Sequence, residues 1–350
     1  MVGLHNYLHM GTLYNQSNGY GAALLHSITS VIPVFGRIFV VADASDSTLQ
    51  YFTALQDLID PDKQGTVRLF GDIEDAYAAV TSNNNDVILL SAYTTHELTE
   101  MMTVAKNRVH FFGMDGGGRL VQQGAKIQLT TTGVATDLAP MLVTGVRNTF
   151  HNLKVINNST TNETLYGFID NGEGTLIENC QFAKIAGLND ANHAHFWMAG
   201  DSCTYRNIVC GQSNIPNTAA GFGILIDGKT GGATDGTVKE NFAENIYVNM
   251  SVGGSVQATS CFIKIADTAA LNFGNVIHGF TGMNFIPSGG TIMTNGVLAP
   301  ASIVAGSLFI TDSAMFGCTG VSDNASAGVQ IAARSLAPVA AGGLATNLSD

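Results

Sequence analysis

Two histidines, a tryptophan and two carboxylates come together in the segment NDANHAHFWMAGD. His193 and His195 are two residues apart, so in a β-strand their side chains would face the same side. Trp197 would face that side too, with Asp190 and Asp201 near the two ends of the segment. An aromatic floor beside polar groups is typical of a sugar-binding site. The alternative interpretation is a polar loop with one buried tryptophan, because spacing alone is weak evidence for a site.

The preceding segment, FIDNGEGTLIEN, adds the carboxylates of Asp170, Glu173 and Glu178. Pairs of carboxylates roughly 5 to 9.5 Å apart cleave glycosidic bonds. Basic residues near these acids are few, and the serine-nucleophile pattern G-x-S-x-G is absent from the sequence. The residues therefore give weak candidates for glycan cleavage, and they require neither an enzyme nor a cofactor or metal.

A second segment, GILIDGKT at residues 223–230, matches the nucleotide-binding pattern G-x-x-x-x-G-K-[ST]. Three of its four middle residues are bulky and apolar, and several glycines follow Thr230, which disfavours the helix start that a phosphate-binding loop needs. We expect a buried strand that ends at an Asp-Gly turn.

The composition favours a protein of many short strands. Of 350 residues, 45% are hydrophobic, only 12% are charged and 40 are glycine. The net charge of −12 disfavours binding to nucleic acid, and the sequence contains neither a signal peptide pattern nor an apolar run long enough to span a membrane. The cysteines lack a C-x-x-C pair, so we expect buried free thiols at Cys180, Cys203, Cys210, Cys261 and Cys318.

An asparagine recurs just before alternating apolar strands, as in TFHNLKVIN, LIENCQFAK, TYRNIVCGQ and FAENIYVNM. The spacings are 45, 27, 28, 38 and 30 residues, and the asparagines are Asn107, Asn152, Asn179, Asn207, Asn245 and Asn275.

A step of this length suits one coil of a right-handed parallel β-helix, in which equivalent residues of successive coils stack about 4.8 Å apart. The fold class is therefore mainly β, with the asparagines stacked at a turn. Val155, Phe182, Ile208 and Ile246 should then lie inside, in one stacked column or in adjacent ones. The alternatives, a β-sandwich or a propeller, would need hairpin turns that are scarce in this sequence.

We predict four regions along the chain. Residues 1–35 form an N-terminal arm, 36–95 an α/β cap, 96–334 the β-helix and 335–350 an extended tail. We expect helices at 46–59 and 73–83, and one or the other should cover the first end, because the open end of a β-helix exposes its apolar interior. We expect the tail, the arm or both to lie across a neighbouring subunit.

The first 115 residues carry a family resemblance. GRIFVVAD, DPDKQGTVRLFGDIEDAYAAV, NNNDVILLSAYTTHELTEMM and KNRVHFFGMDGG, in this order, resemble the opening of pectate-lyase-like β-helix proteins. The lead-in DPDKQGTVRLF, the helix with its Ala pair and the low-charge end APVAAGGLATNLSD are more similar still to β-helix virion proteins of tailed bacteriophages. The resemblance implies a homotrimeric virion protein, assembled in the host cytoplasm, which binds the major capsid protein or another virion component but no nucleic acid or membrane.

Our leading expectation is therefore a structural capsid-decoration (cement) protein of a bacteriophage. The alternative is a tail-spike-like protein that binds or cleaves a host surface glycan. A cellular pectate-lyase-like enzyme is a third interpretation, which the missing signal peptide disfavours.

Overall fold

The computed structural model of the chain describes residues 36–42, 68–92, 94–114, 124–130, 138–160, 165–188, 191–212, 217–228, 237–253, 256, 258–266, 270–271, 274–285, 291–300, 307–323, 328–338 and 344–348. The predicted arm (1–35) and the predicted helix at 46–59 lie outside these ranges.

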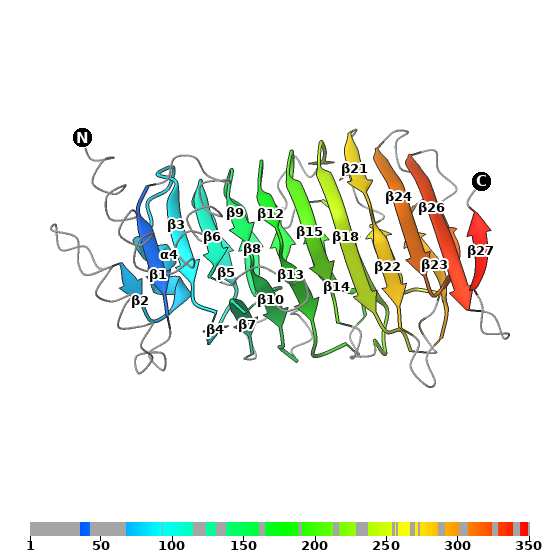
Figure 1. The fold of residues 1–350 in the computed structure, drawn as a ribbon, viewed down its shortest axis with the longest axis horizontal. Coiled ribbons are helices and arrows are strands. Elements are labelled where there is room, and N and C mark those ends of the chain that lie inside the picture. Colours follow the sequence, from blue (N-terminus) through cyan, green and yellow to red (C-terminus); the bar gives the residue numbers. More distant parts are fainter. Residues whose placement is uncertain are drawn as a thin grey trace, which may run out of the picture.

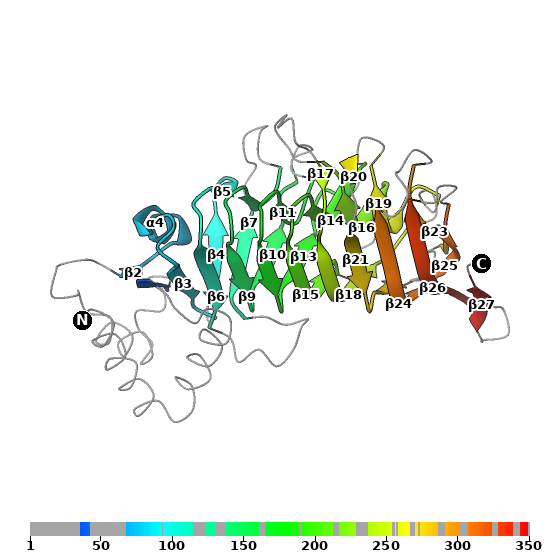
Figure 2. The same cartoon turned by 90° about the horizontal axis from the view of Figure 1, so that it is seen from above.

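Parallel strands wind along one axis and form an elongated solenoid with three faces (Figures 1 and 2). A 17-stranded sheet, called sheet A, bends around two of the three faces of the solenoid. An eight-stranded sheet, called sheet B, forms the third face. We call the two faces of sheet A face 1 and face 2. The pairings join equivalent strands of successive coils, as in β6–β9 and β8–β11. This arrangement is the predicted parallel β-helix.

Face 1 contains β1 (Ile38–Val41), β2 (Leu69–Phe70), β3 (Asp86–Leu90), β6 (Val109–Gly113), β9 (Thr149–His151), β12 (Leu176–Glu178) and β21 (Asn275–His278). Face 2 contains β4 (Thr95–Leu98), β7 (Lys126–Leu129), β10 (Lys154–Asn157), β13 (Gln181–Lys184) and β22 (Thr281–Asn284). Four strands continue across both faces: β15 (Thr204–Cys210), β18 (Phe242–Met250), β24 (Leu308–Phe316) and β26 (Val329–Pro338).

Sheet B contains β5 (Met102–Val104), β8 (Met141–Val143), β11 (Ile169–Asp170), β14 (His193–Met198), β16 (Gly221–Ile226), β19 (Cys261–Ile265), β23 (Met293–Leu298) and β25 (Cys318–Ser322). The remaining elements are the small pair β17 (Thr237–Val238) and β20 (Ala270–Leu271), the terminal strand β27 (Leu344–Leu348) and helix α4 (Ile73–Ala79).

The turn from face 1 to face 2 is made by one residue with positive φ in each of six coils. These residues are Asn152, Asn179, Asn207, Asn245, Gly279 and Asp312. Asparagine tolerates this left-handed conformation better than most residues. The amide of Asn207 donates to Oδ1 of Asn179 at 2.9 Å, and that of Asn245 donates to Oδ1 of Asn207 at 3.3 Å. Four of the six predicted asparagines therefore share one column.

Asn107 and Asn275 do not belong to that column, so the predicted alignment is wrong for them. They lie at the turn from sheet B back to face 1, where Oδ1 of Asn107 accepts from the backbone of Val146 and Asn275 accepts from the side chain of Asn241. A second set of residues with positive φ marks this turn: Arg108, Arg147, Gly174, Ser202, Glu240 and Gly274. Because asparagine suits both turns, its recurrence alone does not separate them.

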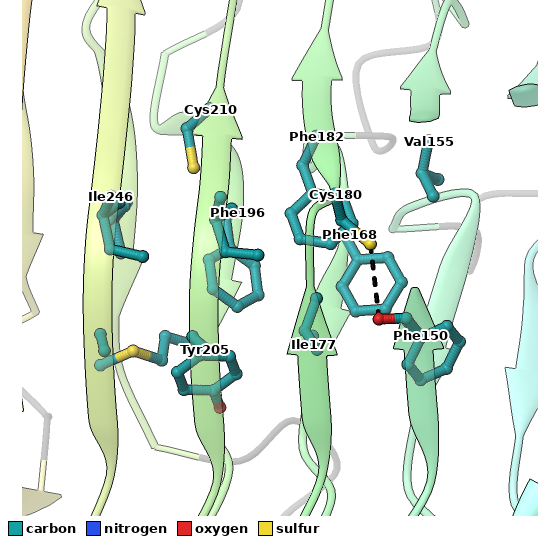
Figure 3. Packing of buried hydrophobic residues seen from close by; sticks show 14 of the residues in the cluster. Phe150, Val155, Phe168, Ile177, Cys180, Phe182, Phe196, Tyr205, Cys210 and Ile246 are labelled. Carbon is teal, nitrogen blue, oxygen red and sulfur yellow. Dashed lines mark hydrogen bonds between the residues drawn. The ribbon is translucent and has the colours of Figure 1, made fainter. Parts of the chain in front are cut away.

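The interior is a continuous apolar core (Figure 3). Val155 pairs in register with Phe182, and Ile208 pairs with Ile246, in adjacent columns. All four side chains are at most 2% exposed, which confirms the predicted interior. Aromatic rings stack from coil to coil: the Phe111 and Phe150 rings lie 5.0 Å apart and nearly parallel, and those of Phe168 and Phe182 lie 4.4 Å apart.

Two further predictions concern single segments. All five cysteines are free and buried, as expected. The apolar part of GILIDGKT belongs to β16, whose six residues are all buried, which confirms the strand; Lys229 and Thr230 lie outside the described residues.

Helix α4 covers the first end of the solenoid, as predicted for the helix at 73–83, although it ends at Ala79. Asp72 caps its start by accepting from the backbone of Asp75, and Ile73 is buried in the core. The Tyr77 ring stacks on Phe111, with 6.1 Å between the ring centres. Nζ of Lys106 donates to three carbonyl oxygens at the end of the helix, those of Tyr77, Ala78 and Val80.

The far end differs from the prediction for the tail. β26 continues the parallel stack on β24, and β27 turns back to pair antiparallel with β26 of the same chain. The expectation that this part of the tail leaves its own coil is therefore wrong for residues 344–348. The reason is that the last parallel strand offers an unpaired edge, which the chain itself covers.

Candidate functional site

The two predicted histidines lie where sheet A meets sheet B. Nδ1 of His195 accepts a hydrogen bond from the backbone nitrogen of Lys184, at the end of β13, at 3.2 Å. The rings of His193 and His195 are 6.5 Å apart, and both side chains are at most 2% exposed. Burial, together with the neighbouring His193, lowers the pKa of His195 to about 3. His195 is therefore a neutral, enclosed group at ordinary pH.

Trp197 lies elsewhere, on the outer face of sheet B. It pairs in register with Ile169 and Leu225 and packs 4.7 Å from the ring of Tyr166, in a cluster separate from the interior core. The predicted common side for the histidines and the tryptophan is wrong. Ala194 belongs to the outer cluster and Phe196, two residues later, to the interior core, so the two-residue alternation breaks at His195 and does not carry on to Trp197.

The structure also separates the predicted acids from the histidines. Asp201 follows the end of β14 that lies away from the histidines. There its backbone forms isolated β-bridges with Glu173 and Lys239 of the adjacent coils. β14 ends at Met198, so Asp201 lies beyond the far end of the strand from His195, at most about 20 Å away. Asp190 lies outside the described residues.

Asp170 is enclosed inside the solenoid. Its carboxylate accepts hydrogen bonds from the Tyr205 hydroxyl at 2.9 Å, the Gly172 backbone at 2.9 Å and the Thr175 hydroxyl at 3.2 Å. Burial raises the pKa of Asp170, and these donors oppose the shift. The group joins the turns of adjacent coils and has no contact with solvent.

The remaining candidate, Glu178, belongs to a line of outward-facing side chains on face 1. One outward-facing position is in register from β3 to β24, and we call it the outer row. Its members are Leu89, Phe112, His151, Glu178, Arg206, Glu244, His278 and Thr311.

The middle of the outer row alternates between basic and acidic groups. Nδ1 of His151 lies 3.3 Å from Oε2 of Glu178, and Nε of Arg206 lies 3.7 Å from Oε2 of Glu244. Nδ1 of His278 lies 3.0 Å from the Thr311 hydroxyl. Burial lowers the pKa of His151, and the Glu178 carboxylate opposes that shift. The side chains of Arg206 and Glu244 are 48% and 38% exposed, so their polar groups are accessible to a ligand.

Aromatic residues stand beside this part of the outer row. The neighbouring outward position of face 1, three residues before each turn, carries Phe242 and, two coils further on, Phe309. Phe242 is 38% exposed, and the Phe309 side chain is half-buried. Across the turn, Tyr247 is half-buried, with its hydroxyl 3.5 Å from the Met283 sulfur.

Together these side chains form a polar line beside an aromatic one, over β12, β15, β18, β21 and β24. The polar side chains repeat at every coil, about 4.8 Å. Phe242 and Phe309 are two coils apart, roughly 10 Å, with Val276 in the same position between them. Hydrogen-bonding groups next to aromatic faces bind ligands that carry hydroxyl groups on one side and C–H groups on the other. Repetition at a fixed step suits a ligand that is itself a linear repeat.

Most of these residues were missed in the sequence, although a signal was present. Each member of the outer row from His151 to Thr311 stands immediately before a residue of the first column of turns, as in FHN, IEN, YRN and AEN. The residue before the repeated asparagine is charged or polar, and it faces outward because the asparagine turns the chain.

Among the described residues, no group of three or more histidine, cysteine, aspartate or glutamate side chains is placed to hold a metal ion. Within the same ranges, no helix is long and apolar enough to cross a membrane.

Comparison with known proteins gives structural matches alone. No protein-family model matches the chain, and no curated protein sequence matches it. A solved pectin methylesterase in complex with a hexasaccharide superposes with a TM-score of 0.51 and 12% identity, over 90% of this chain and 86% of the other. The chain is a right-handed parallel β-helix.

Two other solved structures are similar at lower scores. Pectin methylesterase PemA from Erwinia chrysanthemi has a TM-score of 0.47 and 11% identity, over 90% of this chain and 86% of that one. An alginate lyase from Paenibacillus sp. has a TM-score of 0.42 and 13% identity, over 69% and 72% of the two chains. At 12% identity, the match to the pectin methylesterase in complex with a hexasaccharide describes a shared fold.

Proposed function

We propose that this β-helix binds a linear glycan along the outer face of sheet A, from β12 to β24. The observation that carries the proposal is the exposed pair Arg206–Glu244 beside the exposed ring of Phe242, repeated along the axis by His278 and Phe309. One coil spacing is comparable with the length of a sugar unit, so successive units would meet successive coils.

The two lines of side chains would contribute differently. The rings of Phe242 and Phe309 would pack against the C–H face of a sugar, which contributes apolar contact without a specific hydrogen bond. Arg206 and Glu244 would exchange hydrogen bonds with sugar hydroxyls, and hydrogen bonds to charged groups are stronger than neutral ones. The pectin methylesterase that superposes on this chain was solved with a hexasaccharide, which supports a glycan as the ligand class.

The test is binding to an array of bacterial surface and plant cell-wall polysaccharides, followed by titration calorimetry on the best ligand. Phe242→Ala should weaken binding by about tenfold or more, because a stacked ring and its buried area are lost. Phe285→Ala is the matched control: Phe285 is 39% exposed, close to the 38% of Phe242, but it follows β22 at the far edge of face 2.

Equal weakening by both substitutions, or no glycan bound by the wild-type chain, would overturn the proposal. A reducing-sugar assay on the bound polysaccharide distinguishes binding from cleavage. If the wild-type chain releases sugar and Glu244→Gln abolishes that release, the protein cleaves the glycan rather than only binding it.

We further propose a setting for this activity, which the sequence resemblance supports: a bacteriophage virion, with the chain as a homotrimer attached to the capsid or tail and the glycan on the host surface. Native mass spectrometry of the full chain tests the trimer. The copy number in a purified particle separates the two virion roles, since a handful of copies fits a glycan-binding spike and hundreds fit capsid decoration.

A further inference from the structure

A different part of sheet A brings two lysines side by side. Lys126 of β7 and Lys154 of β10 are paired in register on the outer side of face 2, so their side chains leave adjacent coils in the same direction. Both are half-buried. Like charges directly opposite each other on neighbouring strands destabilise a sheet, and partial burial reduces the screening by water.

Neither ammonium group has an acidic partner within the described ranges. The acid in the adjacent outward position is Glu97, and its carboxylate is already engaged by the side chains of Gln128 and Thr130. Burial lowers the pKa of Lys154, and the charge of Lys126 lowers it further. The pair is therefore a concentrated positive charge that the surrounding side chains do not neutralise.

Gln181, which occupies the same position in the next coil, indicates a ligand that also donates a hydrogen bond. Gln181 of β13 pairs in register with Lys154 and is 1% exposed. Its amide nitrogen donates to the carbonyl of Gly211 at 3.3 Å, which fixes the orientation of the amide. Its oxygen Oε1 is buried and accepts no hydrogen bond within the described ranges. A buried acceptor of this kind is costly unless a donor meets it.

We propose that Lys126, Lys154 and Gln181 form a binding site for a phosphate group that retains a proton. Two ammonium groups would hold the anionic oxygens, and the remaining P–OH would donate to Oε1 of Gln181. Hydrogen phosphate and dihydrogen phosphate both carry such a proton near neutral pH, whereas sulfate does not. The group could belong to free phosphate or to a phosphorylated sugar, and the site is separate from the glycan-binding surface on face 1.

The experiment measures thermal stability and titration calorimetry of the full chain at pH 6.5 with sodium phosphate, sodium sulfate, glucose 1-phosphate or sodium chloride at equal ionic strength. A ligand that binds the folded state alone raises the melting temperature in a saturable way. We expect saturable binding of phosphate and weaker binding of sulfate. A sugar phosphate that binds more tightly than phosphate would assign the site to a phosphorylated glycan, and the reverse would assign it to the free ion.

Three variants and one control make the result specific. Lys126→Gln and Lys154→Gln should each weaken phosphate binding by about tenfold or more, because each removes a charge-assisted contact. Gln181→Met should remove the preference for phosphate over sulfate, which loss of charge alone would not do. Lys264→Gln, a half-exposed lysine on the outer side of β19, should leave binding unchanged.

One measurement without ligand tests whether Lys154→Gln weakens phosphate binding only by destabilising the fold. In chloride alone, Lys154→Gln should raise the melting temperature, because it relieves repulsion from Lys126. The proposal is overturned if phosphate stabilises the wild-type chain no more than chloride does, or if Lys264→Gln weakens phosphate binding as much as the other lysine variants.

Discussion

The outer row of face 1 has the same backbone position in every coil, yet its two halves are in opposite environments. In the first half, Leu89, Phe112 and His151 are between 1% and 7% exposed. In the second half, the side chains of Arg206 and Glu244 are 48% and 38% exposed. The β-helix fixes the direction of each side chain, and the surroundings of each coil decide whether that direction leads to a covered surface or to solvent.

The chemical character of the row follows the same division. The covered half carries an apolar side chain or a neutral ring, as at Phe112, whose ring lies 5.4 Å from that of His151. The open half carries the ionised groups that water can solvate. The structural half and the half that we propose to bind a ligand are therefore separated along the axis on one face, and substitutions in the two halves should have different consequences.

The largest expected difference is between two phenylalanines on the same face. Phe112→Ala should lower the free energy of unfolding by about 3–5 kcal/mol, because it leaves a cavity under a fully buried ring. Phe242→Ala should lower it by less than about 1 kcal/mol, since the exposed ring loses little burial. Urea denaturation of both variants measures the contrast, and equal losses would show that the two halves do not differ as described.

The next effect depends on pH and belongs to His110, two residues before Phe112 in β6. Burial lowers the pKa of His110 to about 4, although the charge of Asp86 acts in the opposite direction. The folded chain then binds this proton less readily than the unfolded chain. The contribution of His110 to the free energy of unfolding should be fully present above about pH 6.5. It should decrease as the pH drops towards 4, by at most about 3 kcal/mol.

His110→Gln should flatten this part of the pH–stability curve, measured by urea denaturation at a series of pH values. Asp86 acts in a separate window: burial tends to raise its pKa, but the ion pair with Arg37 and further hydrogen bonds lower it overall. The stability due to Asp86 should be lost only below about pH 4.

A smaller effect is expected at the turn that follows the outer row. Asn207 has a φ of 53° and takes part in both side-chain hydrogen bonds between asparagines of its column. Asn207→Ala should cost about 2–3 kcal/mol, from the lost hydrogen bonds and from a left-handed conformation that alanine resists. Asn207→Gly keeps the conformation and should cost about 1 kcal/mol less. If the two variants are equally stable in thermal denaturation, backbone conformation contributes nothing at this turn.

The smallest effect on stability should come from the exposed ion pair. Arg206→Ala and Glu244→Ala should each change the free energy of unfolding by no more than about 0.5 kcal/mol, because exposed pairs at such distances contribute little. Both should nevertheless weaken glycan binding. Losses of several kcal/mol would mean that the open half is structural after all and would remove the distinction between the two halves.

The sequence predicts the fold because its signals are local and repeated. Four asparagines with positive φ lie in one column, and the apolar residues just after them face inward, since alternation within a strand of a few residues is reliable. The alignment failed at Asn275, because asparagine side chains also serve the second turn of the coil: Asn275 follows the left-handed residue Gly274, and its Oδ1 accepts from Asn241.

The site was harder to predict because it depends on contacts between coils. The segment with His193 and Trp197 looks like one surface when it is counted in steps of two, but the bend at the edge of the sheet divides it. Arg206, Glu244 and Phe242 lie far apart in the sequence and become neighbours only when the coils are stacked in register. Their positions relative to the repeated asparagine were visible, whereas their exposure was not.

The two columns of turns limit where this chain can gain or lose length. Face 1 has the same length in five successive coils, because five positions always separate the left-handed residue before it from the one after it. The residues before it are Arg147, Gly174, Ser202, Glu240 and Gly274. The asparagine spacings of 28 and 38 residues differ by segments placed elsewhere in the coil. An inserted residue within face 1 would move the side chains between the insertion and the next turn of that coil to the opposite side of the sheet. Natural insertions, and engineered grafts, should therefore be tolerated in the connections that flank sheet B.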